Sequence, residues 1–270
     1  MLAAGQRRIV FHIGPPKTAT TTLQHMLNAN AGRLAPDVAV LARDKLCSRV
    51  RSAAAKVAEG GGRLRRLRLR LEVGRLARRL RARPEPVIIV SDENLLGFST
   101  QTLFDPRGAE TPLRVVDLLE QALPAFDRRY VAYDRPAAAW RDSCRAQAVK
   151  WGGAVEDAEA WARRFPDLDQ AHRNLQALAA RIGARFEILD MSEDVRRDGF
   201  VGRRVLELAG LDAAAIDSLD RVNAKNRANS EASEEFMRAV NTLGLGKTAR
   251  RKVAACVVAH QDLFAGGNRG

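Results

Sequence analysis

Short runs of apolar residues alternate along the chain with longer segments in which apolar residues recur every three or four positions. The short runs predict buried strands at 9–13, 38–41, 87–90, 129–133 and 185–189. The longer segments predict helices at 21–30, 113–123, 134–150 and 199–209, two or three helices between 155 and 182, and helices that begin near 231 and 248. This alternation is typical of an α/β fold with one doubly wound, mainly parallel sheet.

A basic segment lies between the second and third predicted strands. Residues 48–83 are rich in alanine and arginine and are interrupted by a run of glycines at 60–62. From 63 to 83, leucines recur near helical spacing between the arginines, at Leu64, Leu67, Leu71, Leu76 and Leu80. The segment is therefore predicted to be a basic helical insertion. It is either an amphipathic helix with a solvated basic face, or a lid or platform for an acidic acceptor or a membrane surface.

The length and charge of the chain narrow the range of partners. At 270 residues, the chain is long enough for a single α/β domain over 1–270 with a helical tail at 222–270. Its 45 basic and 32 acidic residues leave a net charge of +13. That charge favours anionic partners, which include nucleotides, sulfated or phosphorylated acceptors, nucleic acid and acidic membrane surfaces.

The cysteines and the first residues of the chain indicate where in the cell the protein is expected. Cys47, Cys144 and Cys256 are far apart in the chain and form no metal-binding or disulfide framework. Residues 1–8 lack the apolar core of a signal peptide, and no later run approaches ~18 apolar residues. We therefore expect a soluble, cytoplasmic protein.

The stretch 9–24, IVFHIGPPKTATTTLQ, carries the clearest chemistry. A predicted strand runs into Gly14, two prolines and Lys17, and then into a predicted helix. The first N–H groups of a helix have no partner within it and lie at the positive end of its dipole, so they bind anions. Lys17 would add a full positive charge. Hydroxyl donors would come from Thr18, Thr20, Thr21 and Thr22. The alternative is a tight turn that binds nothing.

The loop departs from the phosphate-binding pattern of nucleotide triphosphatases, because Pro16 stands where that pattern has glycine before the lysine. It resembles instead the loop of the sulfotransferase family, which reads proline, lysine, a small residue, glycine and two threonines. The matching residues are Pro16, Lys17, Thr18, Thr20 and Thr21. Ala19 replaces the glycine, at a cost of about 1 kcal/mol if that position has a positive φ. The resemblance implies a P-loop-like three-layer α/β sandwich with extra helices.

A second motif, YDRPAAAWRDSCRAQ at 133–147, carries the same resemblance. Arg135 leaves a predicted strand, and Ser143 follows eight residues later on the next helix. In sulfotransferases this arrangement grips the 3′-phosphate of 3′-phosphoadenosine 5′-phosphosulfate, the sulfuryl donor. A guanidinium group can bind phosphate oxygens bidentately, and a serine hydroxyl adds a donor. The loop and this motif together imply two anion sites for one nucleotide.

Closure over the nucleotide and recognition of its adenine depend on other parts of the chain. The segment 222–241 is similar to a late basic loop of bacterial sulfotransferase-like proteins, in which Arg227, Asn229 and Ser230 would close over the nucleotide. The alternative is a helix start capped by Ser230 or Ser233. Some family members stack adenine on a tryptophan at the position that Thr22 occupies here. The tryptophans are predicted to be core or interface residues, at Trp140, Trp151 and Trp161.

The resemblance implies metal-free transfer of a sulfuryl group to a hydroxyl or amine of an acceptor, such as a carbohydrate or another metabolite. Lys17 would stabilise charge on the departing nucleotide, and a base would take the proton of the acceptor. We predict that Glu93, just after the strand at 87–90, is this base, with Asp92 second. The alternative for Glu93 is a structural pair with an arginine. Structural roles are predicted for the histidines, His12, His25, His172 and His260.

Two other functions compete with sulfuryl transfer. One is a P-loop kinase, which would need magnesium held by Thr18. The other is a basic protein that binds nucleic acid or an acidic surface through 63–83. An aromatic content of 5% and the lack of a nucleic-acid motif argue against nucleic acid. The acceptor surface of the enzyme is predicted at 48–83 and 95–112.

Overall fold

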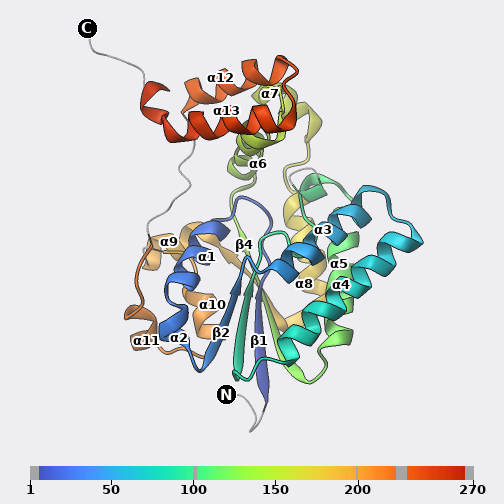
Figure 1. Cartoon of the computed structure of the whole chain (residues 1–270), viewed down its shortest axis with the longest axis vertical. Helices are drawn as coiled ribbons and strands as arrows, with labels where there is room; N and C mark the ends of the chain where they lie inside the picture. Colours follow the sequence, from blue (N-terminus) through green and yellow to red (C-terminus); the bar gives the residue numbers. More distant parts are fainter. Residues whose placement is uncertain (1–5, 100–101, 199, 223–229, 265–270) are drawn as a thin grey trace. The chain divides into compact units, whose positions relative to one another are not determined.

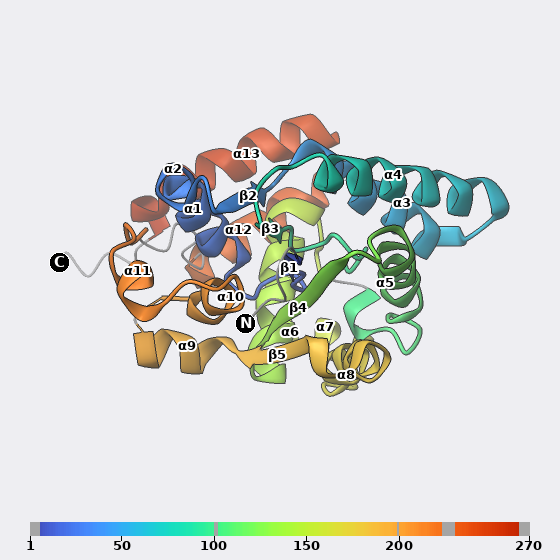
Figure 2. The same cartoon turned by 90° about the horizontal axis from the view of Figure 1, so that it is seen from below.

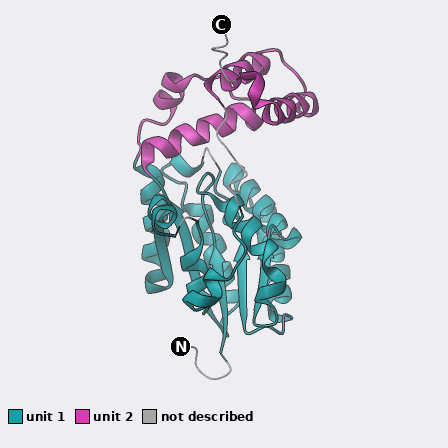
Figure 3. Ribbon diagram, turned by 90° about the vertical axis from the view of Figure 1, so that its left-hand side faces the viewer, with its two compact units in different colours: residues 1–135, 169–225 teal, residues 136–168, 226–270 magenta. Residues whose placement is uncertain are grey.

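The computed structural model describes residues 6–99, 102–198, 200–222 and 230–264. By its internal contacts the chain divides into two compact units (Figure 3). The first consists of Met1–Arg135 and Asp169–Lys225, and the second of Pro136–Leu168 and Asn226–Gly270. The single domain expected over 1–270 stays a prediction.

The first unit is built on a five-stranded sheet in which every neighbouring pair of strands is parallel. In spatial order the strands are β2 (Val38–Ala42), β3 (Val87–Ser91), β1 (Arg7–His12), β4 (Phe126–Asp134) and β5 (Phe186–Asp190). Each predicted strand is present with small shifts of its ends, and the predicted α/β fold with a central parallel sheet is confirmed. Because the strands are parallel, the carboxyl end of β1 lies between those of β3 and β4.

Helices cover both faces of this sheet (Figure 1, Figure 2). On one face lie α1 (Thr20–Ala29), α2 (Ala31–Leu34) and α10 (Arg203–Leu208). On the other lie α3 (Lys45–Gly60), α4 (Arg63–Arg81), α5 (Glu110–Ala122) and α8 (Gln170–Ile182). The remaining helical segments of the unit are η1 (Thr102–Phe104), η3 (Gly183–Arg185), α9 (Met191–Asp198) and α11 (Ala213–Asp217).

Three of these helices, α2, α9 and α11, are absent from the predicted set, and α10 is shorter than the helix predicted at 199–209. The sequence of α9, MSEDVRRD, has too few apolar residues to show a helical period. At its start, the Asp190 carboxylate accepts a hydrogen bond from the backbone N–H of Ser192 at 2.7 Å. Local capping rather than apolar spacing therefore begins this helix.

The predicted basic insertion is a pair of helices, α3 and α4, which pack against each other. The buried face of α4 consists of Leu69, Glu72, Val73, Leu76, Ala77 and Leu80. Leu64, Leu67 and Leu71 are 82%, 53% and 54% exposed. The predicted helix is present, but its leucines lie on two different sides, and these three are on the solvent side. The physical reason is that Leu69, Val73, Leu76 and Leu80 repeat at i, i+4, i+7 and i+11, on the opposite side of the helix.

The second unit is helical. Its segments are α6 (Ala137–Gln147), the π-helical turn η2 (Ala148–Gly152), α7 (Ala158–Arg164), α12 (Glu231–Thr242), α13 (Lys247–Ala259) and η4 (Gln261–Phe264). The helices predicted to begin near 231 and 248 are confirmed. Asn241 of α12 donates hydrogen bonds to the carbonyl groups of Val149 and Ala154, both at 2.8 Å. Of the helices that the structure describes, none has the length and apolar character needed to cross a membrane.

Candidate functional site

The loop between β1 and α1 has the backbone geometry of an anion site. Lys17 and Ala19 both have left-handed backbone conformations, with φ of 74° and 55°. Ala19 is the N-cap residue of α1 and supplies no side-chain cap, and the first turn contains no acidic residue. The first N–H groups of α1 are therefore left to an external acceptor at the positive end of the helix dipole.

The left-handed conformation of Ala19 should lower the stability of the folded chain. Ala19→Gly should raise the free energy of unfolding by about 1 kcal/mol, because glycine adopts this conformation without steric cost. Thermal unfolding should show a melting temperature about 2–4 °C higher. The matched control is Ala55→Gly inside α3, where the same change should lower stability by about 1 kcal/mol. A lower melting temperature for Ala19→Gly would contradict the expected strain.

Polar atoms surround the start of the loop at Gly14. A Cβ atom added there would lie 3.1 Å from Thr18 Oγ1, 3.5 Å from Thr20 Oγ1 and 3.7 Å from His12 Nε2. Thr18 donates to the carbonyl oxygen of Pro15 at 2.9 Å. His12 Nε2 and Thr20 Oγ1 are buried and have no hydrogen-bond partner among the described residues. Buried polar atoms of this kind normally have partners, so the loop fits a ligand with acceptor oxygens.

His12 is a buried link between two strand ends. Its Nδ1 lies 2.9 Å from Ser91 Oγ at the end of β3. Burial lowers the pKa of His12 to about 4, so the ring is neutral near pH 7. Gln24 of α1 donates to the carbonyl oxygen of Ser91 at 3.2 Å. These bonds hold β1, α1 and β3 together next to the loop, a structural role for His12.

Arg135 reaches the loop from the end of β4. Its Nη1 donates a hydrogen bond to the carbonyl oxygen of Lys17 at 2.9 Å. The Asp134 carboxylate beside it accepts from the backbone N–H of Arg135 at 2.7 Å and from the His172 ring, whose Nδ1 lies 2.8 Å away. Two cationic residues separated by 118 positions in the sequence therefore meet at the carboxyl edge of the sheet.

The other residues predicted to hold the nucleotide lie elsewhere in the chain. Ser143 is half-buried on α6 of the second unit, and its pairing with Arg135 stays a prediction. Arg227 and Asn229 lie outside the described residues. Ser230 is the N-cap residue of α12 and accepts from the N–H of Ser233 at 3.3 Å, which confirms the helix-cap interpretation for Ser230.

The remaining loop residues and two of the tryptophans are at least half-buried. Pro16 is buried, and Thr21 and Thr22 are half-buried in the first turn of α1. Trp140 and Trp161 are 0% and 1% exposed in the second unit, which confirms their predicted core role.

Asp92, directly after β3, is a paired carboxylate. It is 1% exposed, and its two oxygens lie 3.1 and 3.2 Å from Arg51 Nη1 of α3. Burial raises the pKa of Asp92, and the charge of Arg51 opposes that rise. Asp92 also accepts from the N–H of Asn94 at 3.2 Å. Arg51 was not predicted as its partner, because an ion pair between distant segments leaves no local pattern in the sequence.

Glu93 is the less constrained of the two carboxylates. Burial and the charge of Asp92 raise its pKa, while Arg51, Lys17 and Arg43 oppose the rise. The effect of Lys17 shows that Glu93 and Lys17 share one electrostatic environment. Glu93 accepts one long hydrogen bond, from Asn94 at 3.4 Å, and forms no ion pair with a described residue. The arginine pairing considered for Glu93 is thus found at Asp92, and a raised pKa suits a general base.

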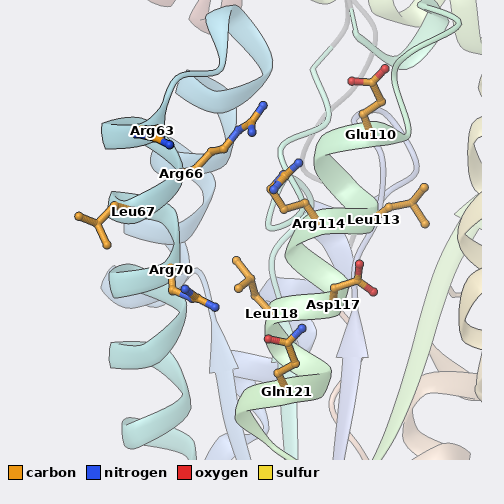
Figure 4. A pocket seen from close by; sticks show the side chains of 10 residues that line it. All are labelled: Arg63, Arg66, Leu67, Arg70, Glu110, Leu113, Arg114, Asp117, Leu118 and Gln121. Atoms are coloured by element: carbon orange, nitrogen blue, oxygen red, sulfur yellow. The ribbon is translucent and has the colours of Figure 1, made fainter.

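Two grooves lie on the face of the first unit covered by α3, α4 and α5. One, of about 570 Å³, separates α4 from α5 (Figure 4) and is lined by Arg63, Arg66, Leu67, Arg70, Glu110, Leu113, Arg114, Asp117, Leu118 and Gln121. The second, of about 300 Å³, adds residues 57–61 and 102–108 and shares Arg66, Glu110 and Arg114 with the first. The segments predicted to form the acceptor surface, 48–83 and 95–112, supply half of the residues that line the first groove and nearly all of those that line the second. No residue of the loop at 13–19 lines either groove.

Within the described ranges, no group of three or more His, Cys, Asp or Glu residues is arranged to hold a metal ion.

No protein-family model matches the chain, and a search of curated proteins found no similar sequence. Two solved structures resemble it weakly. The sulfotransferase from Alicyclobacillus acidocaldarius is 14% identical, with 92% of this chain and 95% of that chain covered and a TM-score of 0.42. The sulfotransferase domain from the curacin biosynthetic pathway is 12% identical, with 94% and 98% covered and a TM-score of 0.41.

Proposed function

We propose that this chain is a sulfotransferase that uses 3′-phosphoadenosine 5′-phosphosulfate. The observation that carries the proposal is the contact between Arg135 and the Lys17 carbonyl group at 2.9 Å. It brings the guanidinium group of the second motif to the loop of the first. A donor with anionic groups at both its 3′ and 5′ positions needs two such cationic groups close together.

In this proposal, each predicted site residue has one role. The N–H groups at the start of α1 and the Lys17 ammonium group bind the 5′ side, where their positive charge stabilises negative charge that builds up during transfer. Arg135 binds the 3′-phosphate, and Ser143, Arg227 and Asn229 are proposed as further contacts of the nucleotide. When bound, the donor supplies the sulfuryl group that is transferred.

Proton transfer is assigned to Glu93. Its raised pKa brings it closer to neutrality than an ordinary glutamate, which improves its ability to take a proton from an acceptor hydroxyl or amine. Asp92 is committed to Arg51 and holds α3 against the end of β3. The reaction proposed here requires no metal ion. The kinase alternative is disfavoured because Pro16 takes the place of the glycine that a kinase loop of this class needs.

A binding experiment tests the proposed donor. The protein should prefer 3′-phosphoadenosine 5′-phosphate over 5′-AMP by about 10–100-fold, since a charge-assisted hydrogen bond contributes about 1.5–3 kcal/mol. Arg135→Ala should remove most of that preference in isothermal titration calorimetry. Arg129→Ala on the same strand, where the guanidinium pairs with Asp127 at 3.1 Å, should retain it. Equal affinity of the unmodified protein for both nucleotides would contradict a 3′-phosphate site.

A further inference from the structure

The exposed side of α4 presents leucines where a surface helix usually presents polar residues. Leu64, Leu67 and Leu71 repeat at i, i+3 and i+7, so they form a stripe along one side of the helix. More than half of each side chain is open to solvent. The opposite side of α4, which includes Leu69 and Leu76, is buried in the first unit. The helix therefore has two apolar sides, and among the described residues only one of them is packed against the rest of the unit.

Arginines border the leucine stripe on both sides. With about 3.6 residues per turn, Arg63 and Arg70 lie along one border and Arg68 and Arg75 along the other, and all four are exposed. In Figure 4, Arg70 extends toward α5, whereas Leu67 points away from it. The acidic residue of α4, Glu72, is buried and binds Arg75 at 2.8 Å. The exposed surface of α4 is therefore apolar in the middle, basic at the borders and free of negative charge.

We propose that this leucine stripe and its arginine borders form a docking surface for an anionic lipid membrane. The axis of α4 would lie parallel to the membrane plane. The three leucines would enter the boundary between headgroups and acyl chains, and the arginine side chains would extend to the lipid phosphates. This inference does not rest on the proposed transfer reaction.

Charge and size favour a membrane over other partners. From Leu64 to Leu71 the stripe is about 10 Å long, at about 1.5 Å per residue. A protein partner that contacted only this stripe would bury much less area than a stable interface needs, whereas a membrane has no such minimum. Nucleic acid would use the arginines but not the leucines, and α4 contains no aromatic residue on which bases could stack.

Vesicle co-sedimentation of the full chain tests the proposal. Binding to vesicles of phosphatidylcholine with phosphatidylserine should exceed binding to pure phosphatidylcholine at least about tenfold. The triple variant Leu64→Ser, Leu67→Ser and Leu71→Ser should bind anionic vesicles with an affinity about tenfold or more below that of the parent. Its melting temperature should stay within about 2 °C of the parent, because substitutions at exposed sites change stability little.

The matched control is Leu243→Ser with Leu263→Ser, which removes leucines that are 69% and 74% exposed outside α4. This control should bind anionic vesicles as the parent does. Equal binding of the parent to neutral and anionic vesicles would overturn the proposal, and so would full binding by the triple variant. If the parent is a dimer in analytical ultracentrifugation and the triple variant is a monomer, the stripe is a contact between copies of the chain and the proposal is overturned. Leucine-dependent binding to a random oligonucleotide, without vesicle binding, would assign it to nucleic acid.

Discussion

Lys17→Met should reduce sulfuryl transfer by about 10³-fold while the protein remains folded. Lys17 is the residue whose charge lies on the loop at the start of α1, and its carbonyl group binds Arg135. Removal of one preorganised group that stabilises charge in a transition state typically costs about 10²–10³-fold in rate, and a full charge lies at the upper end of that range. Methionine and lysine are both non-glycine residues of similar length, so the left-handed backbone at φ 74° costs about the same in each.

The measurement uses radiolabelled donor with a panel of carbohydrate, phenol and amine acceptors, and compares rates on the best acceptor of the panel. Lys56→Met, which removes an exposed lysine from α3, is the matched control and should retain full activity. Lys17→Arg keeps the charge and should lie between the two, because a guanidinium group differs from an ammonium group in shape and reach. A Lys17→Met rate within about tenfold of the parent would remove Lys17 from the proposed chemistry.

Glu93→Gln should lower kcat by about 10²–10⁴-fold, the usual contribution of a general base. Affinity for 3′-phosphoadenosine 5′-phosphate should change by less than about twofold, because Glu93 is assigned to the acceptor side of the reaction. Calorimetry and the transfer assay on the same preparation separate these two effects. Full activity in this variant would assign the base to another residue.

The pH dependence provides a second test of the same residue. A base must be ionised to act, so activity should fall as the pH decreases through the pKa of Glu93, which burial places above the ordinary glutamate value of 4.5. This acidic limb should disappear in Glu93→Gln. Asp92→Asn should behave differently, with a loss of stability of about 1–3 kcal/mol, because Arg51 would lose a charged hydrogen-bond partner while its own side chain, 39% exposed, stays in contact with solvent. Selective loss of transfer in Asp92→Asn, with stability unchanged, would exchange the two roles.

β2 and β3 were predictable because each is a short, almost continuous apolar run, as expected for strands buried on both faces. β4 was predicted only from residue 129, because the charged residues Asp127 and Arg128 stand at its start. The buried side of α4 could not be predicted in this way. Its leucines follow two helical stripes at once, and only packing against neighbouring helices selects the stripe of Leu69 and Leu76 over that of Leu64 and Leu71. The short helices α9 and α11 begin at aspartate caps, so the spacing of apolar residues did not predict them.

At the site, the local sequence predicted the loop, because a strand, a lysine and a helix start are adjacent in the chain. The motif at 133–147 indicated Arg135 only through a family resemblance. The ion pair between Arg51 and Asp92 and the hydrogen bond between His12 and Ser91 join segments that are far apart in the chain. The spacing of apolar residues does not predict such contacts. The strain at Ala19 was expected from the missing glycine, and the φ of 55° confirms it.

The central position of β1 has a consequence for synthesis of the chain. β1 is made before the other four strands of the sheet, yet its two neighbours are β3 and β4, and Ile9 lies opposite Ile88 and Arg128. The side of β1 that pairs with β3 has no partner until Val87–Ser91 has been made, and the side that pairs with β4 has none until Phe126–Asp134 has been made. Pairing across such distances is slow because the intervening chain must first be closed into a loop. During synthesis the apolar segment of β1 therefore waits for both of its native neighbours, a period in which chaperones protect such segments.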